Sequence, residues 1–382
     1  MPGRPFRFLH TADWQMGMKA AGLGQAAEAV RQARLAAAER VLAVAASHGV
    51  ECIVIAGDVF EDNGVDPLLV QQVADILGRA ACPVFILPGN HDPLVAGSVY
   101  DREVWKRTKP VTVWRAREPY PLRADVICFP CPYLSRNTQE ESTSWIPPRE
   151  SGDASLRIGV AHGALRGLTA SEDESACPID PNAATLHGLD YLALGHWHST
   201  FLYPDGPEAA TAYAGSPETT KFGERDSGNV LVVEIPGPGC PPCIVPVHTG
   251  GLVWRQEARD IGSLADCEAL LQAFDREDPG QAGRTLLELT LRGVAPAEAV
   301  ARIQNDLDPL LRARFHFARL VVDGLSLEPT EAELLAIAPA GPVQEACARL
   351  LQMARTTSDE RERTVARLAL AELYALSREV TA

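Results

Sequence analysis

Polar side chains follow short apolar segments at five places in the first two hundred residues. The five clusters are Asp13-Trp14-Gln15, Gly57-Asp58, Gly89-Asn90-His91-Asp92, His162 and Gly195-His196-Trp197-His198. Each apolar segment is typical of a buried strand, and in α/β sheets functional residues gather at the carboxyl ends of strands. The pattern therefore predicts that the five clusters meet in one crevice.

The residue types in these clusters indicate metal chemistry. A mixed set of carboxylate, amide and imidazole donors suits manganese, iron or zinc better than calcium, which prefers oxygen alone. The set is too large for one tetrahedral ion, whereas two ions bridged by a carboxylate would use it fully. Such a pair would polarise a phosphate ester, activate a water and stabilise the leaving oxygen. Each cluster alone also fits an ordinary turn or a structural histidine, so the prediction rests on their succession.

The segments that must position these clusters alternate between strand and helix. In chain order, the pattern predicts a strand at 7–13, a helix at 25–48, a strand at 51–56, a helix at 67–80 and a strand at 83–87. The helix at 25–48 is rich in Ala, and Asp66 before Pro67 is typical of a helix start. Strand, helix, strand at this spacing predicts an α/β sheet with helices covering both faces.

A second unit is predicted to begin near Trp254. Its expected elements are a helix at 263–275, a strand at 284–292, a helix at 296–311 and a strand at 315–323, which together make a small α/β cap. From Thr330 onward the chain is rich in Ala, Leu, Glu and Arg, with a break at 356–359. This last part is predicted to be a pair of helices.

The charge of the chain limits the classes of protein that it can represent. Among 382 residues, 50 are acidic and 35 basic, for a net charge of −15. This argues against a protein that simply coats nucleic acid, whose surface would be basic. It leaves room for a nucleic-acid enzyme with a local basic groove or a partner that holds the substrate. No apolar run reaches the roughly 18 residues of a membrane span, so a cytoplasmic location away from the membrane is expected.

The chain has nine cysteines, and two pairs of them have a spacing that resembles metal-binding motifs. Two residues separate Cys128 from Cys131 in a strand-like run, and two residues separate Cys240 from Cys243 in a proline-rich turn. A zinc site joining the pairs is one interpretation, but neither pair has a flanking knuckle pattern. We therefore expect small buried or loop cysteines.

Six stretches carry a family resemblance: FLHTADWQMG, IAGDVFEDN, VFILPGNHDP, GVAHGAL, LDYLALGHWH and YAGSPETTKFGE. In these stretches the chain resembles the calcineurin-like metallophosphoesterases, and within them the SbcD-type DNA repair exonucleases, the nuclease subunit of a double-strand-break repair complex. The resemblance covers residues 6–235. It implies an α/β fold with a β-sandwich flanked by helices, a small α/β cap and a C-terminal helical tail. The corresponding domains are expected at 1–253, 254–328 and 329–382.

The resemblance also implies two sets of metal ligands, for two divalent ions of which manganese is the expected kind. The implied ligands of the first ion are Asp13, Asp58 and His198, with Asp58 as the bridge. The implied ligands of the second ion are Asn90, His162 and His196.

Two further residues follow Asn90 in the third cluster. His91 resembles the family's proton donor or transition-state stabiliser, and imidazole is suited to proton transfer near neutral pH. Asp92 is expected either to orient His91 or to cap the loop.

Gln15 departs from the family pattern, which usually has His at this place. An amide oxygen can coordinate a metal but binds more weakly than imidazole. We expect a weaker first site with stricter dependence on manganese; the alternatives are that Gln15 binds as the His would, or that catalysis is feeble.

The resemblance implies a two-metal-dependent DNA phosphodiesterase, with exonuclease or endonuclease activity, that acts in DNA repair with an SbcC-type SMC-like ATPase. The tail after residue 330 is the expected docking segment for that ATPase. A homodimer is also expected, with 67–80 and 95–108 as contacts. The alternatives are a phosphoesterase acting on a small molecule or protein, and a catalytically weakened scaffold.

Overall fold

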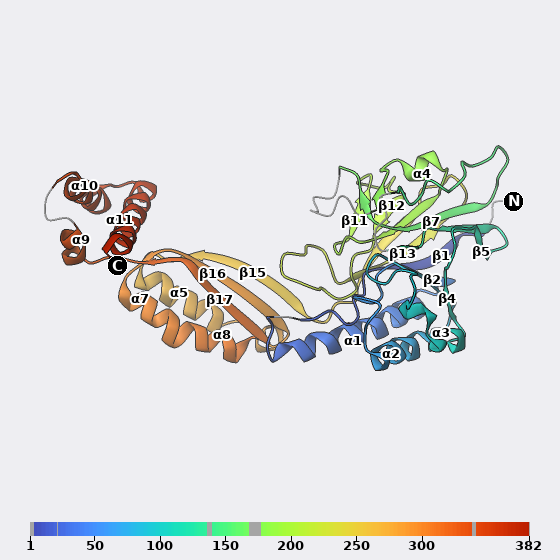
Figure 1. Ribbon diagram of the computed structural model, residues 1–382, viewed down its shortest axis with the longest axis horizontal. Helices are drawn as coiled ribbons and strands as arrows, with labels where there is room; N and C mark the ends of the chain where they lie inside the picture. The colour runs from blue at the N-terminus through green and yellow to red at the C-terminus, as the bar shows by residue number, and fades with distance from the viewer. Residues whose placement is uncertain (1–3, 21, 136–139, 168–176, 338–340, 382) are drawn as a thin grey trace. The chain divides into compact units, whose positions relative to one another are not determined.

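The computed structural model describes residues 4–20, 22–135, 140–167, 177–337 and 341–381 (Figure 1). The chain forms two compact units, Met1–Leu252 and Val253–Ala382. Each unit has its own apolar core, and each is described by itself.

The first unit contains two six-stranded sheets. The first sheet has the spatial order β14 (Cys243–His248), β13 (Asn229–Ile235), β1 (Phe6–Thr11), β2 (Cys52–Ala56), β3 (Val84–Leu87), β4 (Val111–Val113). The second sheet has the order β11 (Phe201–Tyr203), β12 (Thr211–Tyr213), β10 (Tyr191–Gly195), β7 (Leu156–His162), β6 (Val126–Pro130), β5 (Tyr120–Arg123). Strands β1 to β4 run parallel, as do β12, β10, β7 and β6, so in each sheet four carboxyl ends lie at one edge.

The two sheets pack face to face, and the strand period decides which side chains lie between them. Phe8 and Val54 of the first sheet point inward and share one core with Ile158 and Tyr191 of the second. Their neighbours in sequence, such as Ile53, point outward. This alternation follows from the two-residue period of a strand. The first unit is therefore a β-sandwich.

Helices cover the outer faces of the sandwich. The elements outside the two sheets are α1 (Ala26–Ser47), α2 (Pro67–Leu77), a 3-10 turn (Val99–Asp101), α3 (Glu103–Arg107), α4 (Ala183–Leu186) and the short strands β8 (Ala164–Leu165) and β9 (Pro178–Ile179). Apolar side chains of α1, α2 and α3 pack on the outer face of the first sheet. Asp66 accepts a hydrogen bond from Leu68 N at 2.8 Å and Pro67 follows it, which confirms the predicted start of α2.

The prediction of helices on both faces of one sheet is wrong. The inner face of the first sheet packs on the second sheet instead. The strand β2 is buried on both faces, and such a strand has no polar alternation to reveal what covers it. The hydrophobic periodicity therefore could not predict whether helices or a second sheet cover each face of the first sheet.

The second unit begins with a three-stranded parallel sheet. Its elements are β15 (Val253–Asp260), α5 (Leu264–Asp275), α6 (Pro279–Ala282), β16 (Thr285–Ala295), α7 (Ala297–Arg302), a π-helical turn (Ile303–Leu307), α8 (Asp308–Arg314) and β17 (Phe317–Leu327). The helices α5, α7 and α8 lie together on one face of the sheet (Figure 1). The predicted strands and helices of this region are confirmed, except that the π-helical turn interrupts the helix expected at 296–311.

Three helices follow where a pair was predicted. They are α9 (Glu331–Ile337), α10 (Pro342–Thr356) and α11 (Glu360–Thr381). The break at 356–359 is confirmed, but α10 has a start of its own because Gly341 has a φ of +105° and Pro342 lacks a backbone N–H. Residues 338–340 and 382 of the expected tail lie outside the described residues. The division of the second unit into a cap at 254–328 and a tail at 329–382 stays a prediction.

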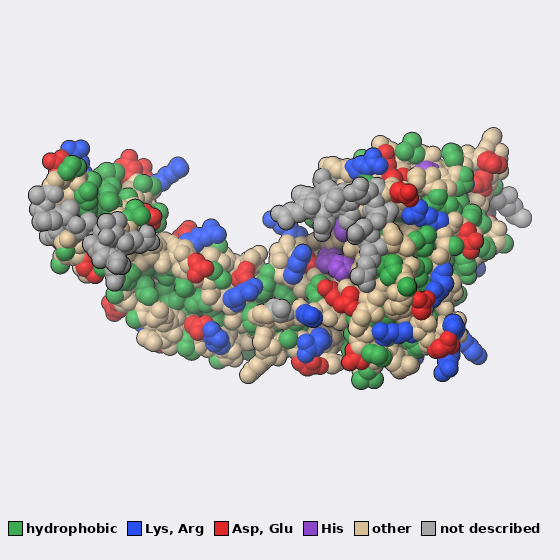
Figure 2. Space-filling model, viewed as in Figure 1, with side chains coloured by type: hydrophobic (Ala, Val, Ile, Leu, Met, Phe, Trp, Pro, Cys, Tyr) green, Lys and Arg blue, Asp and Glu red, His purple; other side chains and the backbone are tan. Residues whose placement is uncertain are grey.

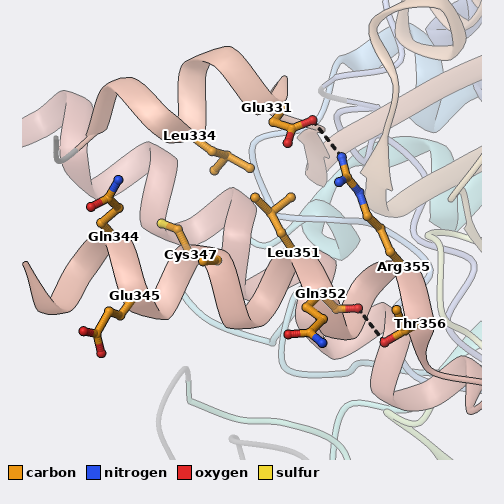
Figure 3. Close-up of a pocket in the computed structure, with 10 residues that line it drawn as sticks. Glu331, Leu334, Gln344, Glu345, Cys347, Leu351, Gln352, Arg355 and Thr356 are labelled. Atoms are coloured by element: carbon orange, nitrogen blue, oxygen red, sulfur yellow. Dashed lines mark hydrogen bonds and ion pairs between the residues drawn. The ribbon is translucent and has the colours of Figure 1, made fainter. Parts of the chain in front are cut away.

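Helices α9 and α10 line a pocket of about 550 Å3 (Figure 3). Its apolar lining includes Leu334 from α9 and Leu351 from α10. At one end of the pocket, Arg355 pairs with Glu331 at 2.8 Å and ties α10 to α9. The buried apolar side chains of the C-terminal helices form a small core of their own, separate from the core of the three-stranded sheet and its helices.

The cysteine pairs lie in different surroundings. Cys128 and Cys131 are buried, whereas Cys240 and Cys243 are exposed at the turn between β13 and β14. The expectation of small buried or loop cysteines is confirmed. Among the described helices, none combines the length and apolar character that crossing a bilayer requires.

His10 joins the two sheets just before the first polar cluster. It lies on β1, is fully buried, and places its Nδ1 3.0 Å from the Tyr191 hydroxyl and its Nε2 3.1 Å from the Leu194 carbonyl oxygen on β10. Burial lowers the pKa of His10 to about 3, although the bond to Leu194 opposes this shift.

The free energy of unfolding should therefore fall as the pH falls from about 6.5 toward 3. In this range the unfolded chain binds one more proton at His10, at a cost of up to about 1.4 kcal/mol per pH unit. Urea unfolding at several pH values should give a shallower slope for His10→Gln than for the natural chain. His316→Gln, at an exposed position, is the control and should keep the natural slope. Parallel slopes for His10→Gln and the natural chain would contradict the prediction.

Candidate metal centre

The polar clusters lie where parallel strands of both sheets end. Asp13 follows β1, Asp58 follows β2 and Asn90 follows β3 in the first sheet. In the second sheet His162 is the last residue of β7, and His196 follows β10. The sandwich therefore brings side chains from two sheets to one edge, as the sequence predicted.

Glycines allow the two sheets to approach closely at this edge. A Cβ on Gly195 would lie 2.0 Å from the Ala56 carbonyl oxygen, and one on Gly57 would lie 2.1 Å from His162 Nδ1. A Cβ on Gly89 would lie 2.1 Å from Asp58 Oδ1. None of these positions can hold a larger residue without displacing backbone or a ligand-type side chain.

Backbone strain gathers at the same edge. Asp13, Gln15 and Asp58 have φ values of 54°, 48° and 54°, in the left-handed region that non-glycine residues rarely adopt. Such conformations persist only where the surroundings hold them, and they are concentrated at functional sites. Here Gln15 N donates to the Asp58 carbonyl oxygen at 3.1 Å, which fixes the two turns to each other.

Asp13, Asp58 and His162 form the centre of the cluster. One ligand atom from each lies within 4.8 Å of the others, and all three side chains are buried. His162 Nε2 lies 3.2 Å from Asp58 Oδ2, and both Asp13 oxygens accept from His196 N at 3.0 Å. The Nδ1 of His162 lies 2.9 Å from the Ala56 carbonyl oxygen and donates to it, so Nε2 is the atom presented to the site.

Asn90 and His196 extend this centre on one side. Asn90 Oδ1 lies 2.8 Å from His162 Nε2 and 3.3 Å from His196 Nδ1. An amide oxygen and two imidazole nitrogens therefore converge on one point. This is a donor set that manganese, iron or zinc accepts.

His198 lies against a carboxylate that the sequence did not single out. Its Nδ1 lies 2.8 Å from Glu224 Oε1 and 3.0 Å from Thr220 Oγ1, which leaves Nε2 for the pocket. A carboxylate behind an imidazole fixes the tautomer and raises the basicity of a metal-binding histidine. Glu224 stands in the stretch YAGSPETTKFGE, which carried the family resemblance, but only the folded chain pairs it with His198.

Gln15 lies at the centre as a buried residue. Its Nε2 donates to Asp58 Oδ2 at 3.2 Å, while its Oε1 is buried and has no hydrogen-bond partner. An unpaired buried acceptor is costly unless something outside the protein satisfies it, and a cation would do so. This orphaned oxygen, with two buried carboxylates beside it, fits a bound divalent metal.

His91 and Asp92 have separate surroundings. The His91 side chain is 42% exposed, with Nδ1 2.9 Å from the Glu61 carbonyl oxygen and Nε2 4.0 Å from Asp58 Oδ2. The Asp92 carboxylate is buried and accepts from Tyr100 OH at 2.6 Å, from Phe60 N at 3.0 Å and from Gly89 N at 2.7 Å. Of the two roles considered for Asp92, the contacts favour capping the loop, because its oxygens bond to other groups while Glu61 orients His91.

The charges of this cluster favour a cation. Burial raises the pKa of Asp13 to about 6, although His162 and His198 oppose the shift. Burial also acts to raise the pKa of Asp58, but the charge and hydrogen bond of His162 outweigh it and hold that pKa well below its usual range. Burial acts to lower the pKa of His162, yet Asp58 raises it to about 9. Without a metal, a proton on His162 therefore balances the carboxylates, and metal binding is expected to release that proton and to weaken at low pH.

A pocket of about 410 Å3 opens beside these side chains. Its lining includes Asp58, His91, His196 and His198. Figure 2 shows histidine side chains (purple) reaching the surface together in a hollow of the first unit. A substrate can therefore reach the cluster from solvent.

Glu224→Gln should weaken metal binding about 10-fold at one site. The substitution keeps the size of the side chain but removes the negative charge behind His198, and such changes cost metal affinity about 10- to 100-fold. Calorimetric titration with manganese measures the effect without any substrate. Glu208→Gln, at an exposed position of the same unit, is the control and should leave affinity unchanged. An unchanged titration for Glu224→Gln would remove Glu224 from the metal centre.

The chain is similar to several known proteins. The chain is 22% identical over 322 residues to the uncharacterized metallophosphoesterase YhaO of Bacillus subtilis, covering 80% of this chain and 76% of YhaO. It is 28% identical over 258 residues to the SbcD component of nuclease SbcCD from Escherichia coli, covering 57% of this chain and 62% of that protein. A solved dimetal phosphatase from Danio rerio aligns with a TM-score of 0.39 and 12% identity, over 63% of this chain and 98% of its own.

The family model for calcineurin-like phosphoesterases matches residues 6–200, which include every one of the five polar clusters. With this match over half of the sequence, the chain belongs to the calcineurin-like phosphoesterase family of metal-dependent phosphoester hydrolases.

Proposed function

We propose that this hydrolase is a DNA phosphodiesterase that uses two divalent metal ions, with manganese as the preferred metal. The observation that carries the proposal is the convergence of donors from both sheets on one open pocket beside His91. The first ion would be held by Asp13, Asp58 and His198, with Gln15 in place of the family's histidine. The second would be held by Asn90, His162 and His196, with Asp58 between the two.

The chemistry divides between the metals and the protein. Bound metals would polarise the phosphate ester and favour ionisation of a water at neutral pH. His91 is suited to deliver a proton to the leaving oxygen, because its Nδ1 faces the Glu61 carbonyl while its exposed ring lines the pocket. Asp92 holds the loop that carries His91 by bonding to Tyr100.

DNA as the substrate is supported by the likeness to the SbcD component of nuclease SbcCD. The protein carries a charge of −15, so it is poorly suited to hold a DNA duplex tightly alone. An SbcC-type SMC-like ATPase that grips the DNA would supply what the chain lacks. We include in the proposal that the helices from α9 onward dock on that ATPase, that the nuclease is a homodimer, and that it works in DNA repair in the cytoplasm.

The test compares three substrates in the presence of manganese: single-stranded DNA, double-stranded DNA and a chromogenic phosphodiester. Cleavage of DNA supports the proposal. Cleavage of the chromogenic ester alone favours a phosphoesterase for small molecules or proteins, and silence on all three without bound metal favours a scaffold. The Asp58→Asn variant, which removes the proposed bridge, should be inactive on every substrate.

His91→Asn should lower kcat on DNA by about 100-fold or more and leave manganese affinity unchanged. General acid catalysis contributes about 10²- to 10⁴-fold, and in this proposal His91 holds a proton rather than a metal. Steady-state kinetics and calorimetry measure the two quantities separately. His316→Asn, at an exposed position of the second unit, should alter neither. A loss of metal affinity in His91→Asn would instead assign His91 to the ligand set.

Gln15→His should tighten the weaker manganese site by about 10-fold and reduce the manganese concentration at half-maximal activity. Imidazole binds these metals more strongly than an amide oxygen does. The measurement is a manganese titration of both binding and hydrolysis. If neither quantity changes, Gln15 already binds as the family's histidine would, and the idea of a weak first site is wrong.

A further inference from the structure

Part of the wall of the pocket beside the metal centre is aromatic. Trp197 follows β10, and Phe222 belongs to the loop after β12; both line the pocket of about 410 Å3. Phosphoester hydrolysis needs metal donors, charge and protons, and neither ring supplies any of these. The two rings therefore need an explanation beyond the proposed chemistry.

The loop that carries Phe222 is fixed to the metal centre at both ends. The Glu224 carboxylate accepts from Thr220 N at 2.9 Å and from the Thr220 hydroxyl. His198 Nδ1 lies within hydrogen-bond distance of both residues. Residues 221–223 form the tip of this closed turn, where Gly223 adopts a φ of +89°. The tip is therefore held in place before any substrate binds.

Both rings are partly exposed to solvent. Phe222 is half-buried, and Lys221 next to it is exposed. Trp197 is half-buried and packs on one side against the apolar cluster of the second sheet's outer face. The pocket thus joins an aromatic surface, a positive charge and the candidate metal donors.

Aromatic side chains with a nearby cation are the features that bind single-stranded nucleic acid, because every base can stack on a ring. The pocket is also larger than a phosphate needs, since pockets of about 300–1,000 Å3 hold whole small molecules. Both features favour a ligand that carries a base as well as a phosphate.

We propose that Phe222, supported by Trp197, stacks on one nucleobase of the strand whose phosphate lies at the metal centre. This inference rests on the proposed function, and it makes an unpaired nucleotide the unit that the pocket recognises. A base must leave its duplex to stack there, so single strands and frayed ends would be the preferred substrates.

Equilibrium binding tests this subsite without requiring catalysis. The natural chain with manganese is titrated calorimetrically with thymidine 5′-monophosphate, with deoxyribose 5-phosphate and with inorganic phosphate. Phe222→Ala should weaken binding of the nucleotide by about 5-fold or more, since stacking on one ring is worth about 1–3 kcal/mol. Binding of the two ligands that lack a base should not change. Phe222→Tyr should restore nucleotide affinity, and Arg225→Ala, an exposed residue just past the loop, should have no effect.

Three results would overturn the inference. They are an equal loss for all three ligands, which would make Phe222 a support for the loop; no loss for any ligand; and no binding of the nucleotide by the natural chain. Hydrolysis of DNA is measured separately. If the protein cleaves DNA but fails the titration, the proposed function stands and the stacking subsite is wrong. If it passes the titration but does not cleave DNA, the subsite stands and the proposed function is wrong.

Discussion

Two carboxylates buried side by side impose the main constraint on this protein. Asp13 and Asp58 lie at the edge where both sheets end, and neither is open to solvent. Buried charges of one sign are costly unless opposite charge compensates them. The imidazoles of His162 and His198 supply compensation in the free protein, and a divalent cation fits the same need. The packing of these two carboxylates therefore favours binding of a divalent metal ion.

The β-sandwich follows from the same constraint, because donors from two sheets must approach within a few ångströms. Gly57 and Gly195 lack the side chains that would keep the sheets apart, and Gly89 leaves room for the Asp58 carboxylate within the first sheet. His10 bonds across the sheets three residues before Asp13, so the two walls of the site cannot slide independently. Strained backbone at Asp13 and Asp58 is held by this frame.

Around this centre, supporting groups decide what each exposed side chain can do. The Glu61 carbonyl orients the His91 ring, and the Glu224 carboxylate orients the His198 ring. The hydrogen bond between Asp92 and Tyr100 holds the loop that carries His91. Because Glu224 also closes the turn that carries Phe222, the geometry of one metal donor and that of the aromatic wall depend on the same carboxylate. A substrate seated against the ring would therefore be aligned with the metal centre.

The sequence by itself determined the donor types, their order and the strands that they follow, because a strand and its terminal turn are local and leave a local pattern. It also determined most helix and strand positions in both units. The strand periodicity alone did not reveal that a second sheet covers the first, since a strand buried on both faces carries no mark of its partner; the β-sandwich was expected only from the family resemblance, and the tertiary structure confirms it. Pairings such as Glu224 with His198, or Asp92 with Phe60, join separate loops whose approach depends on the packed sheets, and no local pattern encodes that approach.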